Sequence, residues 1–188
     1  MGEPKGLLEL DGRTFLSRTV SALVEGGCDP VFVVVAVDEK ELAAEAARAG
    51  AVVVENLAPG EGPITSLRLV LTLLDSTVAG LAYLPVDHPM VRPETVSTLL
   101  QTARTKNALL TIPMIGDKRG HPALFSASLF SELSDLSLEG GARTVVHRHL
   151  EKATQLQVED PGILVDVDTP EAYRALSNTL GSNSEGAR

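Results

Sequence analysis

A carboxylate and an imidazole stand side by side in segment 85–89, Pro-Val-Asp-His-Pro, directly after an apolar run. If that run is a buried strand, Asp87 lies at its carboxyl end, where open α/β sheets bind their ligands. Mg²⁺ prefers one or two carboxylates together with substrate phosphates, so Asp87 is a candidate metal ligand. The alternative is an ordinary turn aspartate before a proline, and His88 by itself predicts only a supporting residue.

A second acidic segment, 164–171, holds Asp166 and Asp168 two positions apart and continues with Thr-Pro-Glu. On an extended strand these two carboxylates share one face. Asp168 also stands where a helix N-cap is expected, with Pro170 early in the helix and Glu171 three residues on. Capping and metal binding do not exclude each other, so both roles stay open for Asp168.

Three further segments could approach an anionic ligand. Residues 56–67 are rich in Gly and Pro, and such a loop lets backbone come close to a ligand while the next helix offers free N–H groups. Lys5 could offset charge on phosphate oxygens, and His121, in Gly-His-Pro at 120–122, could reach a bound substrate. The alternatives are a plain strand-to-helix connection, a disordered N-terminus and a tight turn, respectively.

The composition restricts which partners the surface can bind. The 188 residues include 16 Lys and Arg and 25 Asp and Glu, giving a net charge of −9. This balance argues against binding nucleic acid or an anionic membrane through a broad basic surface. The single cysteine, Cys28, excludes an intrachain disulfide and a multi-cysteine zinc site. No apolar run reaches the roughly 18 residues of a membrane span, and we expect a soluble, cytoplasmic protein.

The segments that must position these residues alternate between two patterns of apolar residues, one typical of strands and one typical of helices. Runs that are apolar on both faces predict buried, largely parallel strands, and the amphipathic stretches between them predict helices. Together they predict one three-layer α/β domain over residues 1–177 and a disordered tail at 178–188. The predicted strands are 31–37, 51–54, 80–86, 108–114, 122–125, 153–158 and 162–167, and the predicted helices are 14–25, 39–49, 65–74, 93–102, 128–136, 140–151 and 170–177.

The order of these motifs resembles that of MobA-like nucleotidyltransferases, which attach a nucleotide to molybdopterin and related acceptors. The resemblance covers about residues 1–177, and Gly-Gly-Ala-Arg at 140–143 keeps its family pattern only in part. It implies a Rossmann-like fold of the nucleotide-diphospho-sugar-transferase type, with a mixed, mostly parallel sheet. The motifs that carry it are Met-Gly-Glu-Pro-Lys at 1–5, the loop at 62–67, Asp-His-Pro at 87–89, Gly-His-Pro at 120–122 and Asp-Val-Asp-Thr-Pro at 166–170.

The same resemblance implies a reaction and a role for each site residue. A substrate phosphate would attack the α-phosphorus of a nucleoside triphosphate and release pyrophosphate. Lys5 would contact the triphosphate, Asp87 would hold Mg²⁺ beneath the α-phosphate, and Asp168 would be the second metal carboxylate. Asp166 would lie beside them or toward the acceptor, which His121 would face. The residues bordering the base and ribose would be Gly62, Pro63 and Ser66.

Gly-His-Pro combined with Asp-x-Asp-Thr-Pro looks closer to the molybdenum cofactor cytidylyltransferase branch than to the guanylyltransferase branch, where Asn-x-Asn-Thr-Pro is usual. We therefore expect cytidylyl transfer from CTP to molybdopterin, with a molybdoenzyme or its maturation chaperone as a potential protein partner. Two alternatives stay open. One is transfer to another phosphorylated acceptor, such as a sugar phosphate or phospholactate, and the other is an inactive module that binds a nucleotide or cofactor.

The family signature begins with a strand and a Gly-rich loop that have no counterpart before Met1. In the family this strand lies in the middle of the sheet, between the strands that match 31–37 and 80–86. Buried, unpaired backbone groups along its two neighbours would cost about 1–3 kcal/mol each. We expect about 15–25 in-frame residues upstream, enough for a strand and its phosphate-binding loop, or else a chain that has lost its activity.

Overall fold

The valine-rich runs form strands because β-branched side chains pack well on a pleated surface, and helices lie between them. The computed structural model describes residues 4–185. Its strands are β1 (Glu9–Leu10), β2 (Arg13–Thr14), β3 (Phe32–Ala36), β4 (Val52–Asn56), β5 (Gly80–Tyr83), β6 (Leu110–Ile115), β7 (Lys118–Arg119), β8 (Ala123–Ser126) and β9 (Thr154–Gln157). Its α-helices are α1 (Phe15–Glu25), α2 (Lys40–Arg48), α3 (Pro63–Leu73), α4 (Pro93–Lys106), α5 (Phe130–Ser134), α6 (Ala142–His149) and α7 (Pro170–Glu185).

The largest sheet is mixed, as predicted, with the order β5-β8-β6-β7 and with β9 parallel to β6. Its strand β8 runs antiparallel to both β5 and β6, so antiparallel pairs are more prominent than the predicted mostly parallel sheet implies. The reason is the short connection from β6 through β7 to β8, because strands joined by a tight turn pair antiparallel. A separate pair, β3 and β4, is parallel.

The sheet is interrupted between β3 and β5. β3 pairs with β4 along one edge, and β5 pairs with β8 along one edge. The other edges of β3 and β5 pair with no strand among residues 4–185. A cavity of about 720 Å³ lies there, lined by residues 31–34, 78–86 and parts of α1, α3 and α4.

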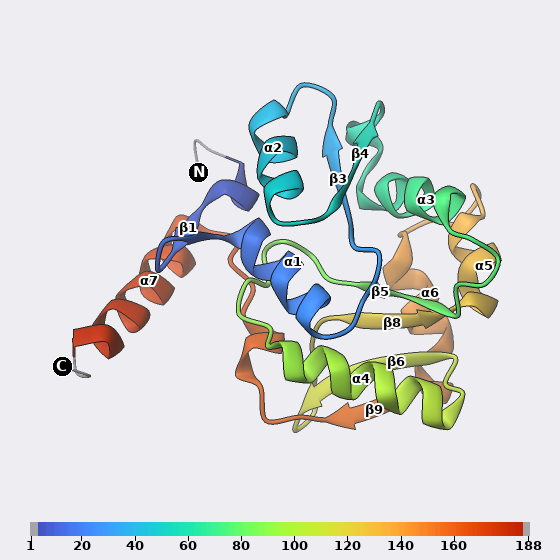
Figure 1. Ribbon diagram of the computed structural model, residues 1–188. Helices are drawn as coiled ribbons and strands as arrows, with labels where there is room; N and C mark the ends of the chain where they lie inside the picture. Colours follow the sequence, from blue (N-terminus) through green and yellow to red (C-terminus); the bar gives the residue numbers. More distant parts are fainter. Residues whose placement is uncertain (1–3, 186–188) are drawn as a thin grey trace.

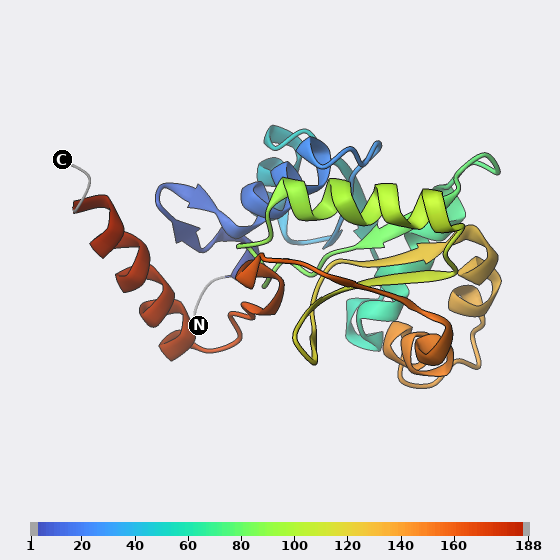
Figure 2. The ribbon, with the colours of Figure 1, turned by 90° about the horizontal axis from the view of Figure 1, so that it is seen from below.

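Helices cover both faces of the sheet, which gives the three layers (Figures 1 and 2). Helices α1 and α4 pack on one face, and α3 and α6 lie on the other (Figure 2). The larger core cluster joins Leu67 of α3 and Val145 of α6 to Leu110 and Phe125 of the sheet. Helix α7 extends away from the body, and its first turns contact β1 (Figure 1) through a hydrogen bond from the Tyr173 hydroxyl to Glu9 O, 2.8 Å.

Two sequence predictions need correction. The strand predicted at 162–167 is a 3₁₀ helix at Pro161–Leu164 followed by extended chain, because the Asp160 side chain caps this turn by accepting from Gly162 N at 2.9 Å. The last helix was predicted to end at residue 177 and continues to Glu185, so much of the predicted disordered tail is helical, and its last three residues lie outside the described range. Among the described residues, no helix has the length and apolarity needed to cross a bilayer.

Candidate active site and metal centre

The acidic residues of the site come from two chain segments that are tied by backbone. Asp87 follows β5 after the connection 84–86, and Val167 N donates to Asp87 O at 3.0 Å. Val165 and Val167 pack into a small core with Leu10 and Phe15. Because side chains alternate along extended chain, Asp166 and Asp168 point to the opposite side, toward solvent and Asp87. The Asp166 carboxylate interacts with those of Asp87 and Asp168, as expected if Asp166 and Asp168 share a face.

Lys5 lies against these carboxylates. The 3₁₀ helix η1 (Lys5–Leu7) brings the ammonium to Asp168, with which it forms a hydrogen-bonded ion pair, and to Asp87 Oδ2 at 3.7 Å. The hydrogen bond from Lys5 lowers the pKa of Asp168, and the same bond raises the pKa of Lys5. The N-terminal lysine and both predicted metal carboxylates therefore meet at the carboxyl end of β5, as the motif order predicts.

Asp87, His88 and Asp166 form the group that could hold a metal ion, with one ligand atom from each lying within 4.8 Å of the others. Asp87 Oδ1 is buried and accepts no hydrogen bond from the described residues. Burial raises the pKa of Asp166, and the neighbouring Asp87 and Asp168 carboxylates raise it further. A divalent cation would offset this repulsion and satisfy the unpartnered oxygen, so the donor set fits Mg²⁺ or a similar ion.

Asp168 is not the N-cap of α7. The hydroxyl of Thr169 accepts from Ala172 N at 3.1 Å, and Tyr173 N donates to Thr169 O. This is the geometry of an N-cap, so the capping role considered for Asp168 belongs to Thr169. The Asp168 carboxylate is left exposed and pairs with Lys5.

The imidazoles of His88 and His121 pack in a tilted arrangement beside the carboxylates, with ring centroids 4.5 Å apart and an interplanar angle of 52°. The ring centroids of Tyr83 and His121 are 6.3 Å apart. Burial lowers the pKa of His88. Burial, and then the neighbouring His88, lower the pKa of His121 to about 4, so both rings are neutral near pH 7. Gly120 has no room for a side chain, since a Cβ there would lie 2.3 Å from Ile163 O. The predicted position of His121 on the acceptor side stays a prediction.

The predicted loop at 62–67 begins α3. Gly62 has φ 93°, which favours glycine, and Pro63 occupies the first helical turn. Asn56, a buried residue that the sequence analysis missed, donates through Nδ2 to Thr65 Oγ1 at 2.9 Å and to Ser66 Oγ at 3.2 Å. Its place as the last residue of β4, just before the Gly/Pro loop, is the signal that could have identified it. Pro63 and Ser66 share the 720 Å³ cavity with residues 83–86, which lead to Asp87.

Asp160 is a second residue missed by the sequence analysis. The residue is only 3% exposed. Its carboxylate accepts hydrogen bonds from Arg92 N at 2.9 Å, Thr95 Oγ1 at 2.7 Å and Gly162 N at 2.9 Å. These bonds join the start of α4 to the loop that carries Asp166 and Asp168. The Asp-Pro-Gly sequence at 160–162 indicates a turn, but nothing in it indicates that the carboxylate is buried.

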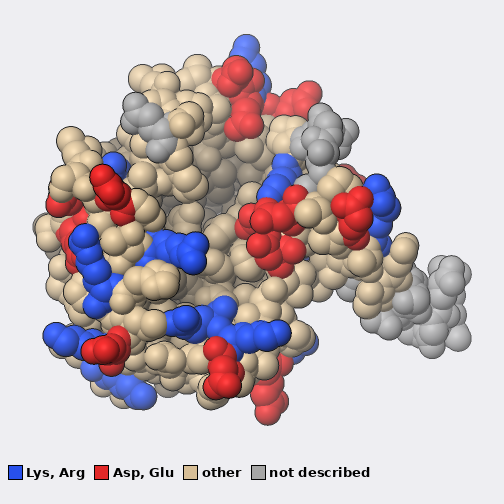
Figure 3. All heavy atoms as spheres, turned by 180° about the vertical axis from the view of Figure 1, so that it is seen from behind, with Lys and Arg blue, Asp and Glu red and all other residues tan. Residues whose placement is uncertain are grey.

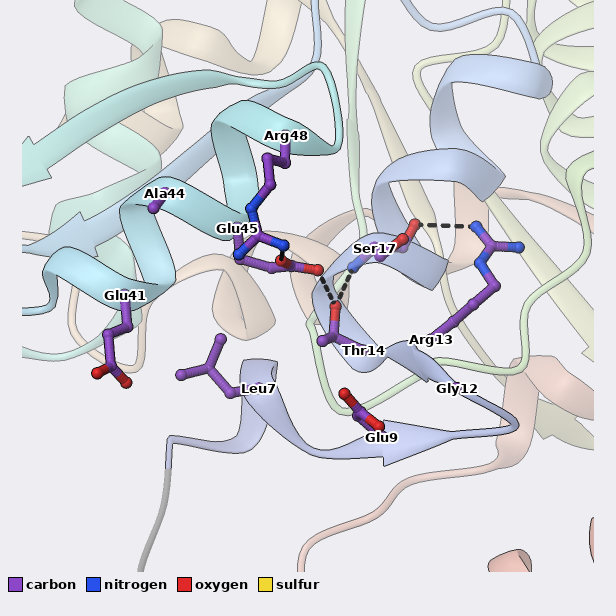
Figure 4. Close-up of a pocket in the computed structure, with 10 residues that line it drawn as sticks. All are labelled: Leu7, Glu9, Gly12, Arg13, Thr14, Ser17, Glu41, Ala44, Glu45 and Arg48. Atoms are coloured by element: carbon purple, nitrogen blue, oxygen red, sulfur yellow. Dashed lines mark hydrogen bonds and ion pairs between the residues drawn. The ribbon is translucent and has the colours of Figure 1, made fainter.

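Another pocket, of about 500 Å³, lies between α1 and α2 (Figure 4). Its buried carboxylate, Glu45, accepts from Thr14 Oγ1 at 2.6 Å and pairs with Arg48 Nη1 at 2.7 Å. Thr14 in turn caps α1 by accepting from Ser17 N at 3.0 Å. These contacts tie the two helices together, so Thr14 and Glu45 in Figure 4 have a structural role.

Charge is unevenly distributed on the face behind that of Figure 1. Figure 3 shows acidic side chains on one side of a hollow and Lys and Arg side chains on the other. An anionic ligand in this hollow would meet basic groups directly on one wall. On the acidic wall it would need a cation between itself and the carboxylates.

Comparisons with known proteins match the chain to one family model and to several similar proteins. Residues 1–153 match the model of the MobA-like NTP transferase domain. The "Probable molybdenum cofactor guanylyltransferase" of Mycolicibacterium paratuberculosis is 29% identical over 168 residues, which cover 87% of this chain and 81% of that protein. The crystal structure of Rv0371c from Mycobacterium tuberculosis H37Rv has a TM-score of 0.80 and 27% identity, covering 95% of this chain and 90% of that one. Its complex with manganese has a TM-score of 0.71 and 28% identity, covering 94% and 93%.

Proposed function

The chain belongs to the MobA-like NTP transferase family, and on this premise we propose that it transfers a nucleotidyl group from a nucleoside triphosphate to the phosphate of molybdopterin. The observation that carries the proposal is the grouping of Lys5, Asp87 and Asp166 at the carboxyl end of β5. The name of the curated relatives supports the acceptor.

The reaction asks little covalent chemistry of the protein. An oxygen of the acceptor phosphate forms a bond to the α-phosphorus, and the bond from that phosphorus to the bridging oxygen breaks, releasing pyrophosphate. Asp87 and Asp166, with Asp168 beside them, would hold the divalent cation, which when bound offsets charge on the α-phosphate. Lys5, now paired with Asp168 and close to Asp87, would contact triphosphate oxygens. Positioning and charge stabilisation account for the rate.

Two nucleotides are candidate donors, each favoured by a specific observation. Gly-His-Pro at 120–122 and Asp-Val-Asp-Thr-Pro at 166–170 resemble the cytidylyltransferase branch, and we propose CTP on this basis. The curated relatives are named guanylyltransferases, which favours GTP. The metal is likewise proposed as Mg²⁺ or Mn²⁺, since the donor set suits a divalent cation and a structural neighbour is a manganese complex.

The test is pyrophosphate release with CTP, GTP and ATP, each offered with molybdopterin, a sugar phosphate or phospholactate. We expect release with molybdopterin and one nucleotide, and its loss in Asp87→Asn. Asp117→Asn, at an exposed turn between β6 and β7, is the matched control and should retain activity. Release with another acceptor alone would move the proposal to that acceptor.

A second candidate function is a module that binds a nucleotide or cofactor without turnover. The observation that favours it is the interruption between β3 and β5, where no described backbone cradles a triphosphate. Measurable nucleotide binding without pyrophosphate release from any pair would support this function over the first.

A further inference from the structure

A third donor stands beside the carboxylates of the candidate metal centre. His88 has a side chain only 10% exposed, and its Nε2 lies 4.0 Å from Asp87 Oδ1. Ligand atoms that each lie about 2.0–2.2 Å from one ion can be up to about 4.4 Å apart. The three ligand atoms of Asp87, His88 and Asp166 lie within 4.8 Å of one another, so side-chain shifts of a few tenths of an ångström would let them share one ion.

Two polar atoms in this group are buried and unpartnered. Asp87 Oδ1 and His88 Nδ1 have no hydrogen-bond partner in the part of the chain that the structure describes. Buried polar atoms in folded proteins nearly always have a partner. A cation between Asp87 Oδ1 and His88 Nε2, which lie 4.0 Å apart, would satisfy the unpartnered aspartate oxygen.

We propose that His88 is a third protein ligand of the metal ion and makes the site bind Mn²⁺ in preference to Mg²⁺. The proposal rests on the proposed function in placing that ion in nucleotidyl transfer. Mg²⁺ takes oxygen ligands and retains waters, whereas an imidazole suits first-row transition metals. One nitrogen among carboxylate oxygens therefore shifts the preference toward Mn²⁺, while a site built from Asp87 and Asp166 alone would lack this bias.

The first experiment measures metal affinity without nucleotide. Free Mn²⁺ is followed by electron paramagnetic resonance during titration of the wild-type protein, and Mg²⁺ affinity is obtained by competition. We expect His88→Asn to weaken Mn²⁺ binding by about tenfold or more, the range typical of altered metal sites, with a much smaller effect on Mg²⁺. His147→Asn, an exposed histidine of α6, should change neither affinity. Equal losses for both ions in His88→Asn would overturn the proposal.

A second measurement begins with the wild-type protein and therefore does not rest only on the His88 variant. Electron spin echo modulation of Mn²⁺ bound to the wild-type protein should show coupling to a ¹⁴N nucleus, which should persist in His121→Asn and disappear in His88→Asn. Absence of nitrogen coupling in the wild type, or its loss only in His121→Asn, would overturn the assignment. Turnover with Mg²⁺ but without nitrogen coupling would refute this inference and leave the proposed function intact. Nitrogen coupling without turnover would support this inference and refute the proposed function.

Discussion

Replacing Asp160 with alanine is expected to lower the free energy of unfolding by about 3–5 kcal/mol, the usual result of removing one partner from a buried charged contact. The carboxylate accepts three hydrogen bonds, from Arg92 N, Thr95 Oγ1 and Gly162 N, and lies 3.6 Å from Arg92 Nε. A hydrogen bond to a charged group contributes about 1.5–3 kcal/mol. The Arg92 side chain is 61% exposed and can be solvated again, so the backbone and Thr95 donors carry most of the loss.

Asn at position 160 should have an intermediate effect. Its amide oxygen can replace one carboxylate oxygen, but its NH₂ group must then face a donor at Gly162 N or Arg92 N. We therefore expect Asp160→Asn to be less destabilised than Asp160→Ala and more than wild type. Both variants loosen the loop that carries Asp166 and Asp168, so Mn²⁺ affinity should fall along with stability.

Urea unfolding followed by circular dichroism gives these free energies. For a domain of this size, 1 kcal/mol corresponds to about 2–4 °C in melting temperature, so Asp160→Ala should melt about 6–20 °C lower. Glu159→Ala, at the exposed neighbouring position, is the control and should stay within about 0.5 kcal/mol of wild type. If the free energy of unfolding of Asp160→Ala lies within about 1 kcal/mol of the wild-type value, this carboxylate does not anchor the loop.

The remaining predictions concern the titration of His121, nucleotide binding by Lys5 and the N-cap of α7. The pKa of His121 is about 4 in the fold against about 6.5 in an unfolded chain; the unfolded state thus binds more protons between these values, and stability should fall as the pH drops from 6.5 to 4. Chemical unfolding across that range should show a flatter dependence in His121→Asn. Lys5→Met should weaken nucleotide binding about 10- to 100-fold in calorimetry, the loss of one charge-assisted contact, whereas Lys106→Met, at the end of α4, should not. Thr169→Ala should cost about 0.5–2 kcal/mol as the loss of an N-cap, and a larger loss in Asp168→Ala would contradict the assignment of the cap.

Local pattern was enough to predict most of the elements and the family. Strand runs such as 31–37 and 80–86 are apolar on both faces, and this property belongs to consecutive residues, so it can be recognised without the fold. The same holds for Asp87 at the end of a strand and for the common face of Asp166 and Asp168.

Contacts between distant segments decided the rest of the site. The bond from Val167 N to Asp87 O brings Asp166 to Asp87 and His88, while Lys5 takes Asp168. The family resemblance implied Asp168 as the second metal carboxylate, and the local pattern also allowed it to be the helix cap. Short-range pattern cannot indicate which carboxylate a remote loop will meet. The anchoring by Asp160 depends likewise on α4 packing against its loop. The residue types and their order along the chain determined which chemistry was available. The long-range packing determined which of those side chains come together in one site.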